Sequence, residues 1–327
     1  MASSAEVEGA AVVDSSVRAP LDSEKWYSLD SAEEEFFTTQ TGIQDPDQLK
    51  KHIIAVQADA YEVYPYPCIY RLAFTSLKIA RLPAYGQLLK IGKERKGALF
   101  LDVGCCVGND VRKAIVDGFP MNQALASDLQ PVRFRHSNKG NLIAFAEFWQ
   151  IGHKLFKSTP NTFPVPFIPG DVFDPAFLAP AEIPATAPTE PLPPLSILTS
   201  LTPLIGRLSA IHASAFFHLF GERQQLELAN RLAALLSPEP GSFILGEHAG
   251  RPEKGLRTEA VHLNFRGTRM FCHCPESWKE MWETEVFGGK GNVKVEAELR
   301  EVKRDDLIGD AVEGTKFYLM AWSVTRL

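Results

Sequence analysis

The segment Leu99-Phe100-Leu101-Asp102-Val103-Gly104-Cys105-Cys106-Val107-Gly108-Asn109-Asp110 carries the strongest structural signal in the chain. Its apolar first half predicts a buried strand, and its two glycines predict a turn that opens a helix. Such a turn leaves backbone N–H groups and a helix N-terminus accessible, which suits a nucleotide or a nucleoside-like cofactor. The dinucleotide fingerprint G-x-G-x-x-G requires glycine where this chain has Cys106 and Asn109, so the pattern argues against NAD.

Around this segment, short apolar runs alternate with helical stretches. That alternation is typical of a parallel sheet covered by helices on both faces, an α/β fold. Strands are expected at residues 98–103, 124–127, 207–212 and 242–247, and helices at 111–117 and 222–236. Alternating polarity at 293–302 and 317–326 predicts a closing antiparallel pair at the sheet edge.

The rest of the chain divides into a tail, a cap and a catalytic region. Residues 1–22 lack periodicity and are expected to form a flexible tail. Residues 23–96 are expected to form a helical cap and substrate lid, with helices from Asp47 to Tyr61 and from Ile69 to Arg81. Residues 97–327 would form the cofactor-binding domain, which includes a proline-rich surface loop at 175–194.

Composition excludes several classes of protein. The 327 residues are 45% hydrophobic and 23% charged, which is ordinary for a globular chain. The formal net charge of −6 gives no basic footprint for nucleic acid. No apolar run approaches a membrane span, and the start of the chain does not read as a secretory signal. Five cysteines make a poor disulfide framework, so a cytoplasmic location is expected. The sequence leaves the oligomeric state open.

Two further acids follow expected strands. Asp128 lies 20 residues beyond Gly108, where a carboxylate can accept bonds from both ribose hydroxyls. The alternative for Asp128 is a helix N-cap on the segment that begins at Leu129. Asp171 stands beside Phe173, where an acid next to an aromatic ring can receive an adenine, and the alternative there is a simple turn at Asp174-Pro175.

These residues together resemble a known family. The acids at 102, 128 and 171 look like the first three cofactor motifs of class I S-adenosylmethionine-dependent methyltransferases. The more specific resemblance, to fungal methyltransferases of terpenoid and meroterpenoid pathways, extends from about Trp26 to Arg326. It is carried by three motifs: Val63-Tyr64-Pro65-Tyr66-Pro67-Cys68-Ile69, Asp102-Val103-Gly104-Cys105-Cys106 and Ile211-His212-Ala213-Ser214-Ala215-Phe216-Phe217-His218-Leu219-Phe220.

The resemblance implies a Rossmann-like, seven-stranded α/β fold with a helical N-terminal cap, and S-adenosylmethionine as cofactor. The implied cofactor contacts fall into four groups: the methionine end (Asp102, Gly104, Cys105, Gly108), the ribose (Asp128, Leu129), the adenine (Asp171, Val172, Phe173) and the sulfonium (His212, Ala213). The broad superfamily has a third glycine where this chain has Cys106, so the backbone at that position is expected to avoid positive φ.

A second departure from the relatives lies at residues 132–146. This polar, basic stretch interrupts a passage that runs directly to Glu147-Phe148-Trp149 in the relatives. It is either a real surface insertion or a translated intron, and the lack of apolar periodicity favours the intron. The helix is expected to resume at Glu147 in either case.

Methyl transfer to a small natural product, often to a carboxylate, is the activity that the resemblance implies. A carboxylate acceptor is already ionised near neutral pH, whereas a hydroxyl acceptor needs a general base. His212 and His218 are the candidate catalytic residues, as a base or as a hydrogen-bond donor to the substrate. The alternative for each is a structural histidine bonded to backbone.

The sequence favours one function over two alternatives. The leading hypothesis is an S-adenosylmethionine-dependent O-methyltransferase acting on an apolar carboxylic acid of a terpenoid type. A nicotinamide-dependent oxidoreductase on a similar sheet and a non-catalytic methyltransferase-like binding protein are the alternatives. Cys272-His273-Cys274 resembles a metal fragment, but one C-x-C without a second pair cannot fill a zinc site, so no metal is expected.

Overall fold

A central β-sheet organises the protein. The computed structural model describes residues 19–129, 147–257, 261–262, 270–304, 307–308 and 316–327. Within these residues the main sheet has six strands in the order β2-β1-β3-β4-β10-β8. The strands are β1 (Phe100–Val103), β2 (Ala124–Ser127), β3 (Ala210–His212), β4 (Phe243–Gly250), β8 (Val293–Val302) and β10 (Phe317–Arg326). The interrupting stretch at 132–146, an insertion or a translated intron, and most of the expected tail lie outside the described residues.

The strand directions match the predicted α/β fold. Strands β2, β1, β3 and β4 run parallel, and β10 pairs antiparallel with both β4 and β8. Beyond β2, Phe167 forms an isolated parallel bridge with Ala126. The six strands occupy the six positions that the sequence predicts, with the antiparallel pair at 293–302 and 317–326 as expected, and the bridge at Phe167 lies where the seventh strand implied by the resemblance would pair with β2.

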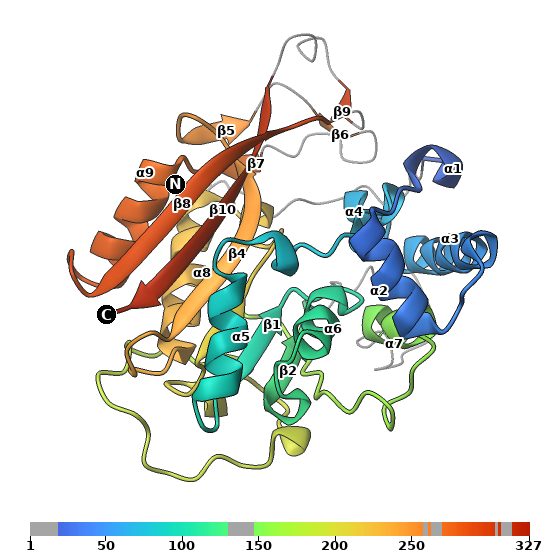
Figure 1. Ribbon diagram of the computed structural model, residues 1–327. Coiled ribbons are helices and arrows are strands. Elements are labelled where there is room, and N and C mark those ends of the chain that lie inside the picture. The colour runs from blue at the N-terminus through green and yellow to red at the C-terminus, as the bar shows by residue number, and fades with distance from the viewer. Residues whose placement is uncertain (1–18, 130–146, 258–260, 263–269, 305–306, 309–315) are drawn as a thin grey trace, which may run out of the picture.

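Alternating side chains bury both faces of the sheet. In β1, Phe100 belongs to one hydrophobic cluster and Leu101 to another, as the pleat of a strand requires. Figure 1 shows α5 (Tyr85–Glu94) and α6 (Asn109–Val116) on one face, and α8 (Glu222–Leu235) with α9 (Pro275–Glu280) on the other. Four parallel strands covered on both faces explain the apolar character of the runs that predicted them.

The N-terminal helices form a separate layer beside the sheet. Figure 1 shows them gathered around α7 (Glu147–Leu155), which contains the residues where the sequence predicted a helix. The helix expected from Asp47 is confirmed as α3 (Pro46–Val63), which Asp45 caps by accepting the Gln48 N–H at 2.8 Å. The other helices of this layer are α1 (Ser23–Trp26), α2 (Ser31–Thr41) and α4 (Pro67–Tyr70).

The second predicted helix of the cap, at 69–81, is wrong. The structure has α4 followed by two short 3₁₀ turns, at Ala73–Thr75 and Ile79–Arg81. The buried Gln57 amide donates to the carbonyl oxygens of Ile69 and Tyr70, at 2.9 Å each. An α-helix would use those two carbonyls to continue, so the side chain of α3 ends α4.

The C-terminal half contains further irregular segments. Residues 275–286 form α9 followed by a π-helical turn at Met281–Val286. The proline-rich residues 175–194 form neither helix nor strand. Two short strand pairs complete the fold: β5 (Gly255–Arg257) with β7 (Met270–Cys272), and β6 (Val261–His262) with β9 (Leu307–Ile308). None of the described helices has both the length and the apolarity that a membrane crossing requires.

Candidate active site

The turn between β1 and α6 needs glycine at two positions. The φ angle is +72° at Gly104 and +77° at Gly108, in the left-handed region. A Cβ atom at Gly104 would lie 2.9 Å from the Phe216 ring, and one at Gly108 would lie 2.7 Å from the Trp149 ring. The predicted glycine turn is therefore confirmed, and aromatic side chains pack directly against it.

The expectation for Cys106 is wrong, because its φ angle is +51°. The Asp128 carboxylate accepts the Cys106 N–H at 2.5 Å, and this bond fixes the orientation of that peptide. A charge-assisted hydrogen bond of about 1.5–3 kcal/mol offsets the cost of roughly 1–2 kcal/mol for a non-glycine residue in this conformation. The acid that the sequence assigned to the ribose thus also supports the glycine turn.

Asp128 lies at the end of β2, beside the turn. Its second oxygen accepts the Leu129 N–H at 2.6 Å, and Ser127 O accepts the Gly104 N–H at 2.8 Å. Burial raises the pKa of Asp128 to about 6. A carboxylate has about four acceptor sites, so the two backbone bonds leave capacity for ribose hydroxyls. The alternative that Asp128 caps a helix would involve N–H groups from residue 130 onward, and these lie outside the described residues.

Asp171 is held next to Asp128 by a backbone contact, since the Gly170 N–H donates to Asp128 O at 3.2 Å. One Asp171 carboxylate oxygen accepts the Phe173 N–H at 2.8 Å. A turn also forms at the next acid, as the alternative reading proposed, because Asp174 accepts the Ala176 N–H at 2.9 Å. Val172 is buried in the core, and Phe173 packs against that core while remaining only partly buried.

The third acid, Asp102, is part of a buried hydrogen-bonded chain. Asp102 Oδ1 lies 2.7 Å from His212 Nδ1, and His212 Nε2 lies 2.7 Å from Ser214 Oγ. Ser214 Oγ also accepts the Glu247 N–H at 3.1 Å, which connects the end of β3 to β4. His212 therefore bonds to two side chains and not to backbone, unlike the structural alternative considered from sequence.

Asp102 and His212 control each other's protonation. Burial raises the pKa of Asp102, although the charge of His212 opposes the change. Burial lowers the pKa of His212, but the charge and hydrogen bond of Asp102 outweigh it, so the pKa of His212 is raised. A raised pKa favours the charged imidazolium, which donates a hydrogen bond from each ring nitrogen.

The second carboxylate oxygen of Asp102 indicates whether the site fits the expected cofactor. Asp102 Oδ2 is buried and has no hydrogen-bond partner among the described residues. An unsatisfied buried carboxylate oxygen is costly unless a ligand supplies a donor. The methionine end of S-adenosylmethionine carries an ammonium group, so the residues present fit that end of the cofactor. Cys105 is buried beside it, and burial raises the pKa of its thiol, so Cys105 contributes a neutral wall.

His218 lies further along the same sheet edge, in a 3₁₀ turn at Phe217–Leu219. Its Nδ1 accepts the Ala249 N–H at 3.3 Å, so His218 is tied to the extended end of β4. Ala213 is buried, and its N–H donates to Leu245 O at 2.9 Å. His212 thus ends β3, and His218 lies in the 3₁₀ turn that follows it, beside the end of β4.

Three polar residues near the turn were given no role there from the sequence. Cys68 of α4 makes a side-chain hydrogen bond with Cys106, which lowers the pKa of the Cys68 thiol to about 7. Burial, followed by the charge of Asp128, raises the pKa of Tyr66. Lys78 contributes positive charge near both Cys68 and His212. The Tyr64-Pro65-Tyr66-Pro67-Cys68 motif was the signal, but only the folded cap brings it to the glycine turn.

The chain is similar to known fungal proteins over most of its length. A family model described as "Meroterpenoid methyltransferase N-terminal domain" matches residues 26–75. O-methyltransferase phiE of Fungal sp. (strain ATCC 74256) is 28% identical over 294 residues, covering 88% of this chain and 83% of that protein. Asnovolin E/Chermesin D methyltransferase nvfJ of Aspergillus novofumigatus is 26% identical over 280 residues, covering 85% and 83%.

Solved structures show a weaker likeness. The 1,6-didemethyltoxoflavin-N1-methyltransferase of Burkholderia thailandensis, solved with S-adenosylhomocysteine, is 13% identical with a TM-score of 0.41, covering 87% of this chain and 92% of that one. That score is too low to support an argument about this chain. The family match and the curated relatives show that the chain is similar to fungal methyltransferases, including one named for meroterpenoid substrates, and the glycine turn with its acids fits that similarity.

Proposed function

We propose that the protein transfers a methyl group from S-adenosylmethionine to a carboxylate of a terpenoid or meroterpenoid molecule, giving a methyl ester. In this reaction the sulfur–carbon bond of the donor breaks as an oxygen–carbon bond forms, and S-adenosylhomocysteine leaves. The relatives support the pathway class, because they include a protein named as an asnovolin E/chermesin D methyltransferase. The choice of a carboxylate is supported by the two histidines.

Neither histidine offers a nitrogen suited to a general base. His218 Nδ1 accepts the Ala249 N–H, so the proton of the neutral ring is on Nε2. Both nitrogens of His212 are engaged, with Asp102 and Ser214, and its raised pKa favours the protonated ring. A hydroxyl acceptor would need a base, whereas a carboxylate needs only to be oriented. This hydrogen-bond pattern is the observation that carries the proposal.

The residues around the turn would position the cofactor. The αL turn at Gly104 and Gly108 and the unsatisfied Asp102 Oδ2 would hold its methionine end. Asp128 would accept the ribose hydroxyls, and Asp171 with Phe173 would face the adenine. Bound S-adenosylmethionine supplies an electrophilic methyl group with its own leaving group. The protein then has to orient the acceptor and exclude water, which is how positioning lowers such a barrier.

Mass spectrometry tests the reaction directly. Extracts from cells that express the chain with its neighbouring pathway genes are supplied with a donor bearing a trideuterated methyl group. The expected product gains one trideuteromethyl group and loses it as methanol on mild alkaline hydrolysis, as an ester does. A label that resists such hydrolysis would show transfer to a hydroxyl or a carbon and would contradict the carboxylate.

A substitution at His218 tests its role as donor. His218→Ala removes the Nε2 donor, so we expect turnover to fall by about tenfold or more while affinity for S-adenosylhomocysteine changes little. His218→Gln retains an N–H donor at a similar position and should recover part of the turnover. An equal loss of cofactor affinity and turnover in His218→Ala would move His218 to the cofactor site.

A further inference from the structure

Ser214 lies two residues beyond the end of β3, at the carboxyl edge of the sheet. Its side chain is only 8% exposed, so neighbours or a ligand must satisfy the polarity of its hydroxyl group. Oγ lies 2.7 Å from His212 Nε2 and accepts the Glu247 N–H at 3.1 Å. These are the two bonds that the described residues make with Ser214 Oγ.

The Asp102–His212 pair decides which atom donates in the first of these bonds. Asp102 Oδ1 lies 2.7 Å from His212 Nδ1, and both side chains are buried. Burial lowers the pKa of His212, but the charge and hydrogen bond of Asp102 raise it by more, so the pair keeps a shared proton. Whichever of the two residues carries that proton, His212 Nε2 retains its own hydrogen and donates it to Ser214 Oγ.

The hydroxyl hydrogen of Ser214 is therefore left for a ligand. A hydroxyl group has two acceptor sites and one donor hydrogen. The His212 Nε2–H and the Glu247 N–H fill both acceptor sites of Oγ, and the described residues offer no acceptor for its hydrogen. A buried donor without an acceptor is destabilising, and an oxygen atom of a bound molecule would remove that cost.

Ser214 lies where a ligand of this sheet is expected to bind. In the sheet, β2 lies on one side of β1 and β3 on the other, and ligands of open parallel sheets bind at the carboxyl ends beside such a reversal. The Phe216 ring, two residues beyond Ser214, lies 2.9 Å from the position of a Cβ atom at Gly104. Ala215 has a φ angle of +53° and donates its N–H to Glu247 O at 2.6 Å, which fixes the backbone after Ser214. The hydroxyl is thus held beside the glycine turn.

We propose that the Ser214 hydroxyl donates a hydrogen bond to the carboxylate of the acceptor molecule and orients that carboxylate for methyl transfer. This inference rests on the proposed function, because it takes the acceptor to be a carboxylate. The ionised group suits this donor, because a charge-assisted hydrogen bond is about twice as strong as a neutral one. His212 and Asp102 are then positioning residues, because they set the direction in which Ser214 donates.

The methionine end of the cofactor carries a carboxylate too, so the same donor chemistry has two sources. The assignment to the acceptor follows from position. Ser214 is bonded to Glu247 of β4, on the side of β3 away from β1. The methionine end is expected on the other side, at the turn that follows β1.

Calorimetric titration of the full chain, saturated with S-adenosylhomocysteine, tests the contact with farnesoate as an isoprenoid carboxylate probe. Wild-type protein should bind farnesoate saturably and its alcohol counterpart, farnesol, more weakly. Ser214→Ala should weaken farnesoate binding about 10- to 100-fold, as expected for a lost charge-assisted bond, and leave the affinity for S-adenosylhomocysteine unchanged. Ser209→Ala is the matched control, because this serine is equally buried at the opposite end of β3, and it should change neither affinity.

The pH dependence of farnesoate binding separates this role from a purely structural one. When the Asp102–His212 pair loses its shared proton, His212 Nε2 accepts the Ser214 O–H, and the ligand loses its donor. Farnesoate affinity should therefore fall as the pH rises through the raised pKa of His212, and Ser214→Ala should not show this fall. The charged groups around His212 are Asp102 of β1, Asp110 of α6, Lys78 of the cap and, on the neighbouring β4, Glu247, which pairs with Arg300.

Four results would overturn the proposal: no saturable binding of farnesoate, unchanged farnesoate affinity in Ser214→Ala, an equal loss in Ser209→Ala, or a loss of affinity for S-adenosylhomocysteine alone. The last result would assign Ser214 to the carboxylate of the cofactor. If Ser214→Ala fails to fold, Ser214→Cys decides the outcome, because its thiol is a weak donor and should give a smaller loss of farnesoate affinity. The methyl-ester assay is run on the same preparations, so transfer of the label to a hydroxyl or a carbon reveals a failure of the proposed function separately.

Discussion

Asp128 has two functions in this account, and they depend on the same carboxylate. It accepts the Cys106 N–H and so supports a left-handed cysteine, and it is the proposed acceptor for the ribose hydroxyls. Sequence spacing placed the acid correctly at the end of a strand. It did not predict the conformation of Cys106, because that depends on a hydrogen bond between residues 22 positions apart.

The pKa of Asp128 leads to a prediction about pH. Burial raises it to about 6, so the carboxyl is protonated below that pH and loses acceptor capacity. We expect affinity for S-adenosylhomocysteine to rise as the pH increases through about 6, because the ionised form accepts stronger hydrogen bonds, each worth roughly 1.5–3 kcal/mol. Calorimetric titration across this range measures the effect.

Two variants identify the group responsible for this change of affinity with pH. Asp128→Asn should bind more weakly and show a flat profile through the same range. Cys68→Ala should keep the rise in affinity through about pH 6. It serves as the control because the Cys68 thiol, near the same turn, has a pKa of about 7. A wild-type profile in Asp128→Asn would remove Asp128 from the cofactor site.

Other residues of the site show why sequence alone found some of them and missed others. Asp102 and His212 were both proposed from their motifs, but their mutual bond joins adjacent strands β1 and β3 and appears only in the sheet register. Ser214 was quoted in a motif and given no role. Its bonds to His212 and to the Glu247 N–H depend on how β4 passes beside β3.

At the scale of elements, the β1–α6 turn is the part of the structure least tolerant of change. Gly104 and Gly108 combine positive φ with contacts to aromatic rings, so both conformation and space demand glycine. The sequence predicted this turn well because the need for glycine is local. It failed at residues 69–81, where the Gln57 side chain of a neighbouring helix stops α4.

Gly108→Ala tests the requirement for glycine in the turn. Its Cβ would lie 2.7 Å from Trp149 at a φ of +77°, so we expect the free energy of unfolding to fall by about 1–3 kcal/mol and the affinity for S-adenosylhomocysteine to fall as well. Gly86→Ala in α5 is the control, because no described atom lies within 4 Å of its Cβ position. There we expect a gain of roughly 0.5–1 kcal/mol from helix propensity, measured by urea unfolding. Equal effects of the two substitutions would contradict the role of the turn.

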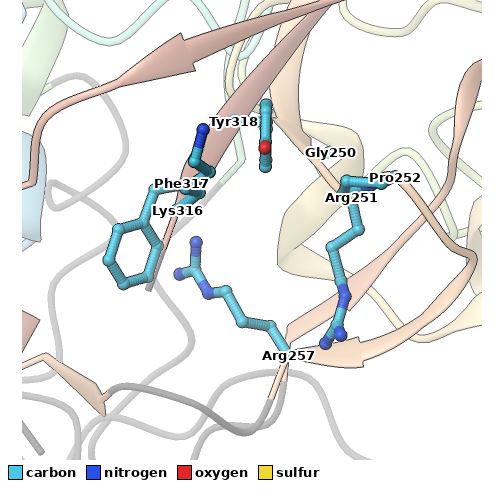
Figure 2. Close-up of a pocket in the computed structure, with 7 residues that line it drawn as sticks. All are labelled: Gly250, Arg251, Pro252, Arg257, Lys316, Phe317 and Tyr318. Carbon is cyan, nitrogen blue, oxygen red and sulfur yellow. The ribbon is translucent and has the colours of Figure 1, made fainter. Parts of the chain in front are cut away.

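Across the whole molecule, the layers were predictable and the contacts between them were not. Apolar runs and helical periodicity predicted the parallel strands and the antiparallel pair of β8 and β10, because each element buries its own face. The approach of the cap to the glycine turn, seen in the Cys68–Cys106 contact, had only a motif as its signal. The cavity lined by Gly250 and Tyr318 (Figure 2) had none, since these two residues come together only when β4 pairs with β10.

The most direct test of the central claim is calorimetric titration of the purified chain with S-adenosylhomocysteine and, separately, with NAD. The account predicts saturable one-to-one binding of S-adenosylhomocysteine, no binding of NAD, and a loss of about 1.5–3 kcal/mol in Asp128→Ala for each charge-assisted bond removed. Binding of NAD in place of S-adenosylhomocysteine, or full wild-type affinity in Asp128→Ala, would contradict it.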